Sequence, residues 1–133
     1  MAANTTPIFV ITPHLGMVRI STANTNRDGT GTLGDVLTAT TFGTRIDRIV
    51  IEATGTTTAG MIRLIIYDGV SASRLWKEIN VSAITPSGTV QAFTATISSP
   101  DQNPLLVLPA GYVLRAGTQA AETFDVIAHG GDY

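Results

Sequence analysis

The sequence consists of short runs of β-forming residues that Gly, Pro, Asn and Asp repeatedly interrupt. This pattern constrains the fold more than any other feature, because it is typical of β-strands joined by tight turns. Apolar residues do not recur at the i, i+3, i+4 spacing of an amphipathic helix. Thr, Val and Ile, whose branched side chains favour extended backbone, are abundant instead. The chain is therefore expected to be all-β.

The clearest strand is Arg45–Thr54 (RIDRIVIEAT), in which apolar and polar side chains alternate as a pleated strand requires. Its two faces are predicted to be Ile49, Ile51 and Ala53 on one side and Arg48, Val50 and Glu52 on the other. The segment Met61–Asp68 is apolar on both faces, interrupted by Arg63. Such a strand is expected to be buried on both faces or to lie at an interface.

The remaining elements are predicted from the same signals. Strands are expected at Ile8–Thr12, Met17–Thr22, Val36–Thr41, Leu75–Val81, Gln91–Ser98, Leu105–Leu108 and Phe124–His129, and a turn leading into a strand at Leu108–Gly117. Pro13 should end the first strand, Ala23–Asp35 and Ser99–Pro104 should be loops, and Gly130–Tyr133 (GGDY) should form an exposed tail.

Nine or ten short strands predict two antiparallel sheets packed face to face, because one sheet could not cover its own apolar face. A jelly-roll β-sandwich is the first expectation and an immunoglobulin-like sandwich the second. At 133 residues the whole chain, 1–133, is expected to form a single domain. Residues 1–11 are expected to form an extended N-terminal arm that could pair with an edge strand of a neighbour.

The composition bears on partners. The chain is 44% hydrophobic and 14% charged, which predicts apolar surface buried against another protein. A net charge of −2 without a basic cluster argues against a nucleic-acid partner. The absence of cysteine excludes disulfides and thiolate metal sites. The polar start MAANTTP and the short apolar runs predict synthesis in the cytoplasm and no membrane contact.

The chemistry-bearing residues do not form a recognisable catalytic set. The two histidines, His14 and His129, lie far apart in the sequence and form no ligand pair. Nucleophile-elbow, P-loop and dinucleotide motifs are missing from the sequence. We therefore expect no catalytic residues and no cofactor, and a protein that is not an enzyme.

The loop 24–35 shows partial spacing of a calcium-binding loop. Counted from residue 24, oxygen-bearing side chains occupy positions 1, 3, 5, 9 and 12 of that pattern, and they are Asn24, Asn26, Asp28, Thr32 and Asp35. Position 6 is Gly29, as the pattern requires. The pattern departs at both ends, where Asn replaces Asp and Asp replaces Glu, and its flanks are strands. Asn24, Asn26, Asp28 and Asp35 are thus candidate metal ligands, and the alternative is a glycine-rich loop held by Asx turns.

Three residues are candidates for a partner interface. Trp76, the single tryptophan, is either an interface anchor or a core residue. Arg48 and Arg63 interrupt apolar strand surfaces and could anchor a partner through bidentate pairing. The alternative is that both arginines face solvent.

Four blocks carry a resemblance over most of the chain: Thr22–Thr32 (TANTNRDGTGT), Gly55–Asp68, Leu108–Ala116 (LPAGYVLRA) and Phe124–Tyr133 (FDVIAHGGDY). In order and spacing these blocks resemble small tailed-bacteriophage proteins of the capsid cement, or decoration, type. The resemblance implies a jelly-roll virion component that oligomerises on the shell and clamps neighbouring subunits. It brings no catalytic residues.

The sequence thus leads to one expected function and one alternative. The expectation is a capsid decoration protein on the outer surface of the virion, with the major capsid protein and further copies of itself, as a trimer, as partners. The alternative is a tail-fibre or baseplate adhesin domain that binds host-surface carbohydrate through aromatics such as Tyr67, Trp76 or Tyr112. A hydrolase acting on host polymers is disfavoured because no acid/base pair is evident.

Overall fold

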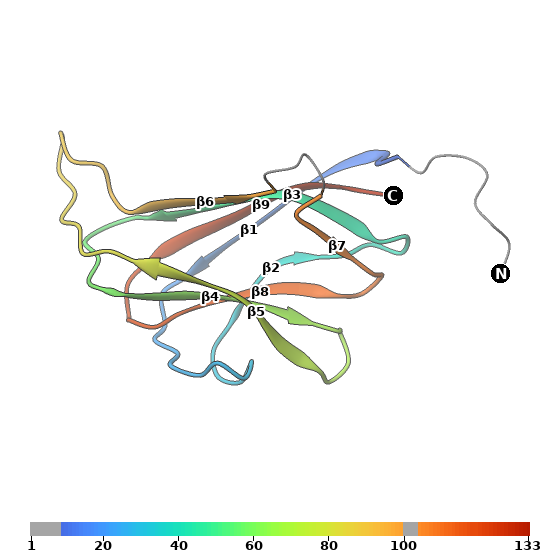
Figure 1. Cartoon of the computed structure of the whole chain (residues 1–133), viewed down its shortest axis with the longest axis horizontal. Helices are drawn as coiled ribbons and strands as arrows, with labels where there is room; N and C mark the ends of the chain where they lie inside the picture. Colours follow the sequence, from blue (N-terminus) through green and yellow to red (C-terminus); the bar gives the residue numbers. More distant parts are fainter. Residues whose placement is uncertain (1–8, 100–103) are drawn as a thin grey trace, which may run out of the picture.

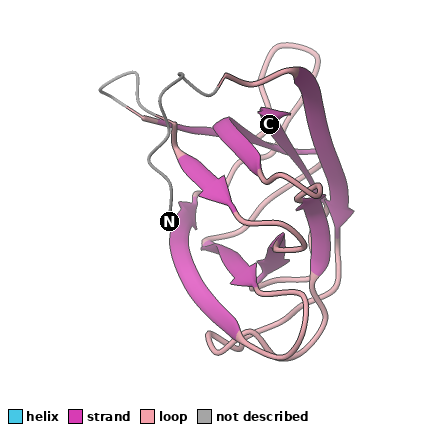
Figure 2. Cartoon of the chain, turned by 90° about the vertical axis from the view of Figure 1, so that its right-hand side faces the viewer, coloured by secondary structure: helices cyan, strands magenta, loops and turns pink. Residues whose placement is uncertain are grey.

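The computed structural model describes residues 9–99 and 104–133, which form strands and loops without a helix (Figures 1 and 2). The predicted all-β class is thereby confirmed. The strands of this described part are β1 (Thr12–Ile20), β2 (Gly34–Thr38), β3 (Thr44–Ala53), β4 (Gly60–Tyr67), β5 (Ser73–Val81), β6 (Thr94–Ser98), β7 (Leu106–Leu108), β8 (Val113–Thr118) and β9 (Phe124–Asp132).

The strands form two antiparallel sheets, which lie one above the other in Figure 1. Sheet A has the order β1-β9-β3-β6, with the short β7 also paired to β3, and sheet B has the order β2-β8-β4-β5. Most connections cross from one sheet to the other, and the β4–β5 hairpin stays within sheet B. The predicted sandwich of two antiparallel sheets is therefore confirmed.

The core fills the space between the sheets with the inward side chains of both. On β3 the predicted alternation is confirmed, because Ile49, Ile51 and Ala53 are buried and their neighbours are more exposed. Burying one such isoleucine stabilises the fold by about 1.5–3 kcal/mol. At one end of the core Phe93 packs edge-on against Phe124, with ring centroids 6.2 Å apart and planes at 87°.

Strand β4 is buried on both faces, as its sequence predicted. Its inward face packs in the core, and the loop 21–33 covers its outward face. Gly29, with a positive φ of 87°, packs beside Ile65 and lies so close to Ser73 that a side chain there would collide with Ser73. Leu33 approaches Gly117 of β8 in the same way. The outward side of β4 and β8 is therefore covered by the chain's own loop, which lies below these strands in Figure 1.

Pro13 does not end the first strand, contrary to the prediction. Strand β1 runs continuously through Pro13, which lies opposite Gly131 of β9. Because β1 is at the edge of sheet A, the missing N–H of Pro13 removes no ladder hydrogen bond that the sheet needs. Of the predicted strand 8–12, Ile8 lies outside the described residues, residues 9–11 precede β1, and Thr12 is the first residue of β1.

The C-terminal residues do not form an exposed tail, so that prediction is wrong. Strand β9 continues to Asp132, and the N–H of Tyr133 donates to the Gly43 carbonyl at 3.2 Å. Gly130 faces the backbone of Arg45 so closely that a Cβ would collide with the Arg45 carbonyl oxygen. Glycine is therefore required for β3 and β9 to pair at this point.

Parts of two predictions fall outside the described residues. The N-terminal arm 1–11 is described from Phe9 onward, and the loop 99–104 is described at its two ends. In residues 9–99 and 104–133, no helix has the length and apolar character needed to cross a membrane.

Candidate interaction surface

The outer face of sheet A carries an uncovered row of apolar side chains. Met17 of β1 lies opposite Ile127 of β9, which in turn lies opposite Val50 of β3. Met17 is 70% exposed, and Leu15, two residues earlier on the same side of β1, is 55% exposed. We call Leu15, Met17, Val50 and Ile127 the sheet A row. Outward residues of a sandwich are usually polar, so this row is the feature that requires a functional explanation.

A shallow hollow and a charged border lie beside the sheet A row. The hollow measures about 320 Å³ and is lined by Met17, Ile127 and the next pair along the strands, Arg19 and Asp125. Arg19 donates to the two carboxylate oxygens of Asp125 at 2.7 and 3.0 Å. This paired guanidinium keeps the pKa of Asp125 below its ordinary value through the hydrogen bond. The border is therefore polar but carries no net charge from this pair.

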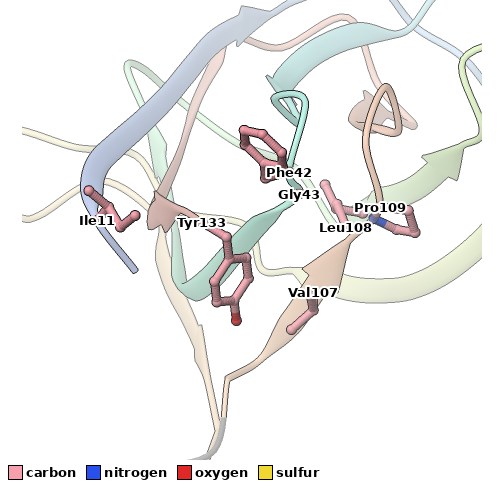
Figure 3. Close-up of a pocket in the computed structure, with 7 residues that line it drawn as sticks. All are labelled: Ile11, Phe42, Gly43, Val107, Leu108, Pro109 and Tyr133. Atoms are coloured by element: carbon pink, nitrogen blue, oxygen red, sulfur yellow. The ribbon is translucent and has the colours of Figure 1, made fainter. Parts of the chain in front are cut away.

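A second apolar feature lies at the end of the sandwich where β7 and the C-terminus meet (Figure 1). Figure 3 shows side chains from the start of β1, the β2–β3 turn, β7 and the C-terminus around one opening. The opening is a groove of about 550 Å³, which we call the end groove. It is lined by Ile11, Phe42, Gly43, Val107, Leu108, Pro109 and Tyr133.

The walls of the end groove are fixed by the turn between β2 and β3. Gly43 has a φ of 89° and donates its N–H to the Thr40 carbonyl at 3.0 Å, which closes the turn. Phe42 is thereby held at the tip, where it is 79% exposed. The hydrogen bond from the Tyr133 N–H to Gly43 joins the C-terminus to the same turn.

A partly buried polar cluster joins the end of this turn to strands β1 and β9. The Asp132 carboxylate accepts a hydrogen bond from the Thr44 hydroxyl at 2.6 Å and lies 2.7 Å from His14 Nδ1. The Asp132 side chain is 16% exposed. Burial raises the pKa of Asp132, but the hydrogen bonds from Thr44 and His14 outweigh it and hold that pKa below its ordinary value.

This cluster predicts a loss of stability in acid that depends on Asp132. An unfolded aspartate has a pKa of about 3.9. Because the folded-state pKa is lower, ionised Asp132 stabilises the fold above that pH, and the contribution disappears as the pH falls through the folded-state pKa. Urea unfolding at pH 7 and pH 3 should show D132N less stable than wild type at pH 7 and closer to it at pH 3. An equal difference at both pH values would contradict this role.

The loop that contains the candidate calcium ligands is organised by Asn24. Its side-chain amide donates to the carbonyl oxygens of Thr30 and Thr32, both at 2.9 Å, and its Oδ1 accepts the N–H of Asn26 at 3.0 Å. Asn24 is 7% exposed. Asp28 accepts the N–H and hydroxyl of Thr30, which lower its pKa. The amide of Asn24 therefore occupies the position from which a cation would bind these carbonyls.

The four candidate metal ligands are only partly brought together. Asn24, Asn26 and Asp28 are linked through Thr30, whereas Asp35 pairs with Arg115 of β8 at 2.8 Å. Among the described residues, no three His, Cys, Asp or Glu side chains gather as a group that could hold a metal ion. The hydrogen bonds of the loop correspond to the Asx-turn alternative.

Substitution of Asn24 should destabilise the protein. N24A removes three hydrogen bonds of a buried amide and leaves two carbonyls without this partner, so the free energy of unfolding should fall by about 2 kcal/mol. N26A is the matched control, because Asn26 is exposed and should change stability by about 0.5 kcal/mol or less. Denaturant unfolding measures both. Equal effects would show that Asn24 does not organise the loop.

The interface prediction is wrong for Arg63 and remains a prediction for Arg48. Arg63 is 3% exposed, so its guanidinium is not available to a partner. It donates to the Asn24 carbonyl at 3.0 Å and to Gln119 Oε1 at 2.7 Å, and Glu78 lies 3.8 Å from its Nε. Arg63 thus joins the covering loop to sheet B. Arg48 is exposed on sheet A, opposite His129 and Ser98.

The aromatic residues singled out from the sequence are partly covered. Trp76 is half-buried and packs against the core, and the Lys77 ammonium lies 5.3 Å from its ring centroid. The Arg115 guanidinium lies 3.9 Å from the ring centroid of Tyr67. Trp76 therefore contributes to the core, and its role as an interface anchor remains a prediction.

Sequence reasoning missed the residues that make up the two apolar features. The signal for Phe42 was an aromatic residue inside the polar turn TTFGT, where folding alone does not require one. Met17 and Leu15 alternate with Gly16 and Val18, which shows that two residues share a face but not that the face is open.

The comparisons with known proteins do not add a family to these observations. No protein-family model matches the sequence, and no curated protein sequence matches it significantly.

Proposed function

We propose that this chain is a structural protein of a tailed-bacteriophage virion, which binds the outer surface of the capsid and cements its subunits. The sheet A row carries the proposal. On sheet B the chain's own loop covers the outward side of β4 and β8, while sheet A presents apolar side chains from β1, β9 and β3 on its outer face. An open apolar surface rimmed by polar residues is typical of a protein-binding site.

The strand order supports a jelly roll as the finer description of the fold. The orders β1-β9-β3-β6 and β2-β8-β4-β5 place four main strands in each sheet, and most chain connections cross from one sheet to the other. A jelly roll consists of eight strands in two sheets built from two Greek keys. Viral capsid proteins and lectins both use this fold, so the site and not the fold decides between them.

The resemblance to decoration proteins lies mainly in elements that build the fold. Its blocks correspond to the loop over sheet B, strand β4, the segment from β7 into β8, and strand β9. These blocks therefore support a shared architecture. The docking function rests on the open row on sheet A.

Several charged side chains are held in ion pairs, and this arrangement fits a binding role better than a catalytic one. These acidic and basic side chains of the described residues are joined in cross-strand or loop pairs, namely Arg19–Asp125, Arg27–Glu78 and Arg115–Asp35. Carboxylates held in this way serve structure and solubility. We therefore propose that the protein acts without a catalytic site or a cofactor.

The mechanism would be linkage by mass action. A protein that binds the assembled lattice, and not the free subunits, lowers the free energy of the assembled state. Binding as a homo-oligomer, expected to be a trimer, would let one particle contact several capsid subunits at once and multiply the effect.

The adhesin alternative is less well supported by the geometry. Sugar binding needs open aromatic faces beside polar groups, and the faces of Tyr67 and Trp76 are approached by Arg115 and Lys77. The end groove is open, but its lining is apolar and offers few hydrogen-bonding groups to a sugar.

The copy number of this chain in purified particles of the encoding phage tests the proposal. Quantitative mass spectrometry relative to the major capsid protein should give a number comparable to that of the shell protein. A handful of copies per particle would place the chain in the tail and favour the adhesin. Absence from particles would overturn both virion functions.

A further inference from the structure

Two protruding apolar side chains precede β1, and the second of them, Ile11, also lines the end groove. Phe9 is 72% exposed and Ile11 is 82% exposed. The intervening Val10 packs toward Gly131, and the N–H of Ile11 donates to the Asp132 carbonyl at 2.8 Å. The segment is therefore fixed to β9 by its backbone, and an extended chain places Phe9 and Ile11 on the same side. One end of the molecule thus has both a hollow and a pair of apolar protrusions.

We propose that the end groove receives Phe9 and Ile11 of a second copy of this chain. The inference rests on the homo-oligomer part of the proposed function and assigns the surface that forms it. The groove supplies Phe42, Val107 and Pro109 as walls, and the incoming side chains match them in chemistry. Aromatic and aliphatic residues that enter an apolar pocket are the usual anchors of protein interfaces.

The charges around the groove favour a second copy of this chain over a partner whose surface is uniformly acidic or uniformly basic. None of the seven lining side chains carries a charge. Arg45 of β3 lies opposite Val107 of β7. The Arg45 side chain forms an ion pair with Asp47, with 2.9 Å between Nε and a carboxylate oxygen. A border that holds both signs in one pair allows a second copy to approach with opposite charges facing each other.

Other occupants fit these observations less well. A small ligand is normally oriented by several convergent polar groups, whereas the Tyr133 hydroxyl is the one polar side-chain group among the lining residues. An anionic lipid surface would require a basic border, but Arg45 is paired with Asp47. Reciprocal insertion would give a two-fold dimer, and one-directional insertion would give a ring such as a trimer if the rotation between copies closes.

Light scattering of the purified full chain across micromolar concentrations tests the proposal. Wild type should give the mass of a dimer or trimer, and F42S, which alters an exposed turn residue, should weaken association about tenfold or more. V107S should weaken it as well. V90S is the matched control, because Val90 and Val107 are 47% and 48% exposed and Val90 lies in the β5–β6 loop at the opposite end (Figure 1).

Circular dichroism and thermal unfolding of each variant separate loss of association from loss of folding. A monomeric wild type at all concentrations would overturn the proposal. An oligomer that F42S and V107S leave unchanged, or that V90S disrupts equally, would overturn it too.

A second test uses the absence of cysteine from the chain. Two single-cysteine variants, I11C and V107C, carry different affinity tags, are mixed, and are oxidised mildly. Because each chain has one thiol, a disulfide that joins the two tags must form between copies. We expect this mixed product in preference to a pairing of I11C with V90C, and equal yields of the two would contradict the assignment.

The two proposals fail separately. Loss of self-association in F42S with retained binding to capsids would leave the sheet A row as the docking surface. An oligomer that never binds capsids would leave the end groove assigned and overturn the virion function.

Discussion

Replacement of Arg63 by methionine is expected to destabilise the protein by about 3–5 kcal/mol, the usual cost of breaking a buried charged network. Methionine retains most of the aliphatic stem but removes the guanidinium. The Asn24 carbonyl and Gln119 would lose their donors, and Glu78 would lose a nearby cation. The loop 21–33 would also lose its attachment to β4. Urea unfolding and hydrogen exchange of the loop amides measure the two effects.

Arg74 provides the matched control. It is exposed on β5, and the one hydrogen bond recorded for its side chain goes to the carbonyl of the adjacent Ser73. R74M should therefore change the free energy of unfolding by about 0.5 kcal/mol or less. If R63M were as mild as R74M, the covering loop would not depend on the buried arginine.

Substitution of Gly130 by alanine is the second large effect we expect, with a loss of about 3 kcal/mol or more. A Cβ at this position would collide with the carbonyl oxygen of Arg45, and a backbone atom cannot move aside as a side chain can. Strands β3 and β9 would have to separate beside the bulge at Ile46 and Arg48. The end groove would change shape because Asp132 and Tyr133 follow directly.

The control is the same substitution at Gly88, where a Cβ would meet nothing within 4 Å and φ is not positive. G88A should be neutral or stabilise the protein by up to about 1 kcal/mol, because alanine restricts the unfolded chain. Thermal unfolding of the two variants gives the comparison. Similar melting temperatures for G130A and G88A would show that the close approach at Gly130 is not required.

The parts of the fold that were predicted correctly depend on local patterns. Alternation in Arg45–Thr54 identified the inward face of β3, since a pleated strand has a period of two residues. The apolar character of both faces of Met61–Asp68 predicted burial on both sides. Each of these patterns lies within a single strand. The burial of its residues can therefore be predicted without knowing which strand pairs with it.

The parts that were missed depend on pairing between distant segments. Gly130–Tyr133 has the composition of a tail, because glycine has no side chain to indicate that a strand packs against it. Arg63 has the pattern of a surface residue, but its acceptors come from positions 24 and 119.

The sheet A row was missed for the same reason. Met17, Ile127 and Val50 belong to three strands, and the strand register that aligns them is not encoded in any one of the three. The loop 24–35 shows the opposite case, in which a local oxygen-rich pattern is explained by hydrogen bonds within the loop.

The central claim, that the sheet A row binds the capsid lattice, is tested most directly by cosedimentation with shells that lack this protein. Wild type should bind saturably, in a number comparable to the major capsid protein. M17E, with a charge in the row, should not bind, whereas V70E, with a charge on a more exposed residue in the β4–β5 turn, should bind as wild type does. Wild-type chain that stays in the supernatant, or M17E that binds as tightly as wild type, would contradict the account.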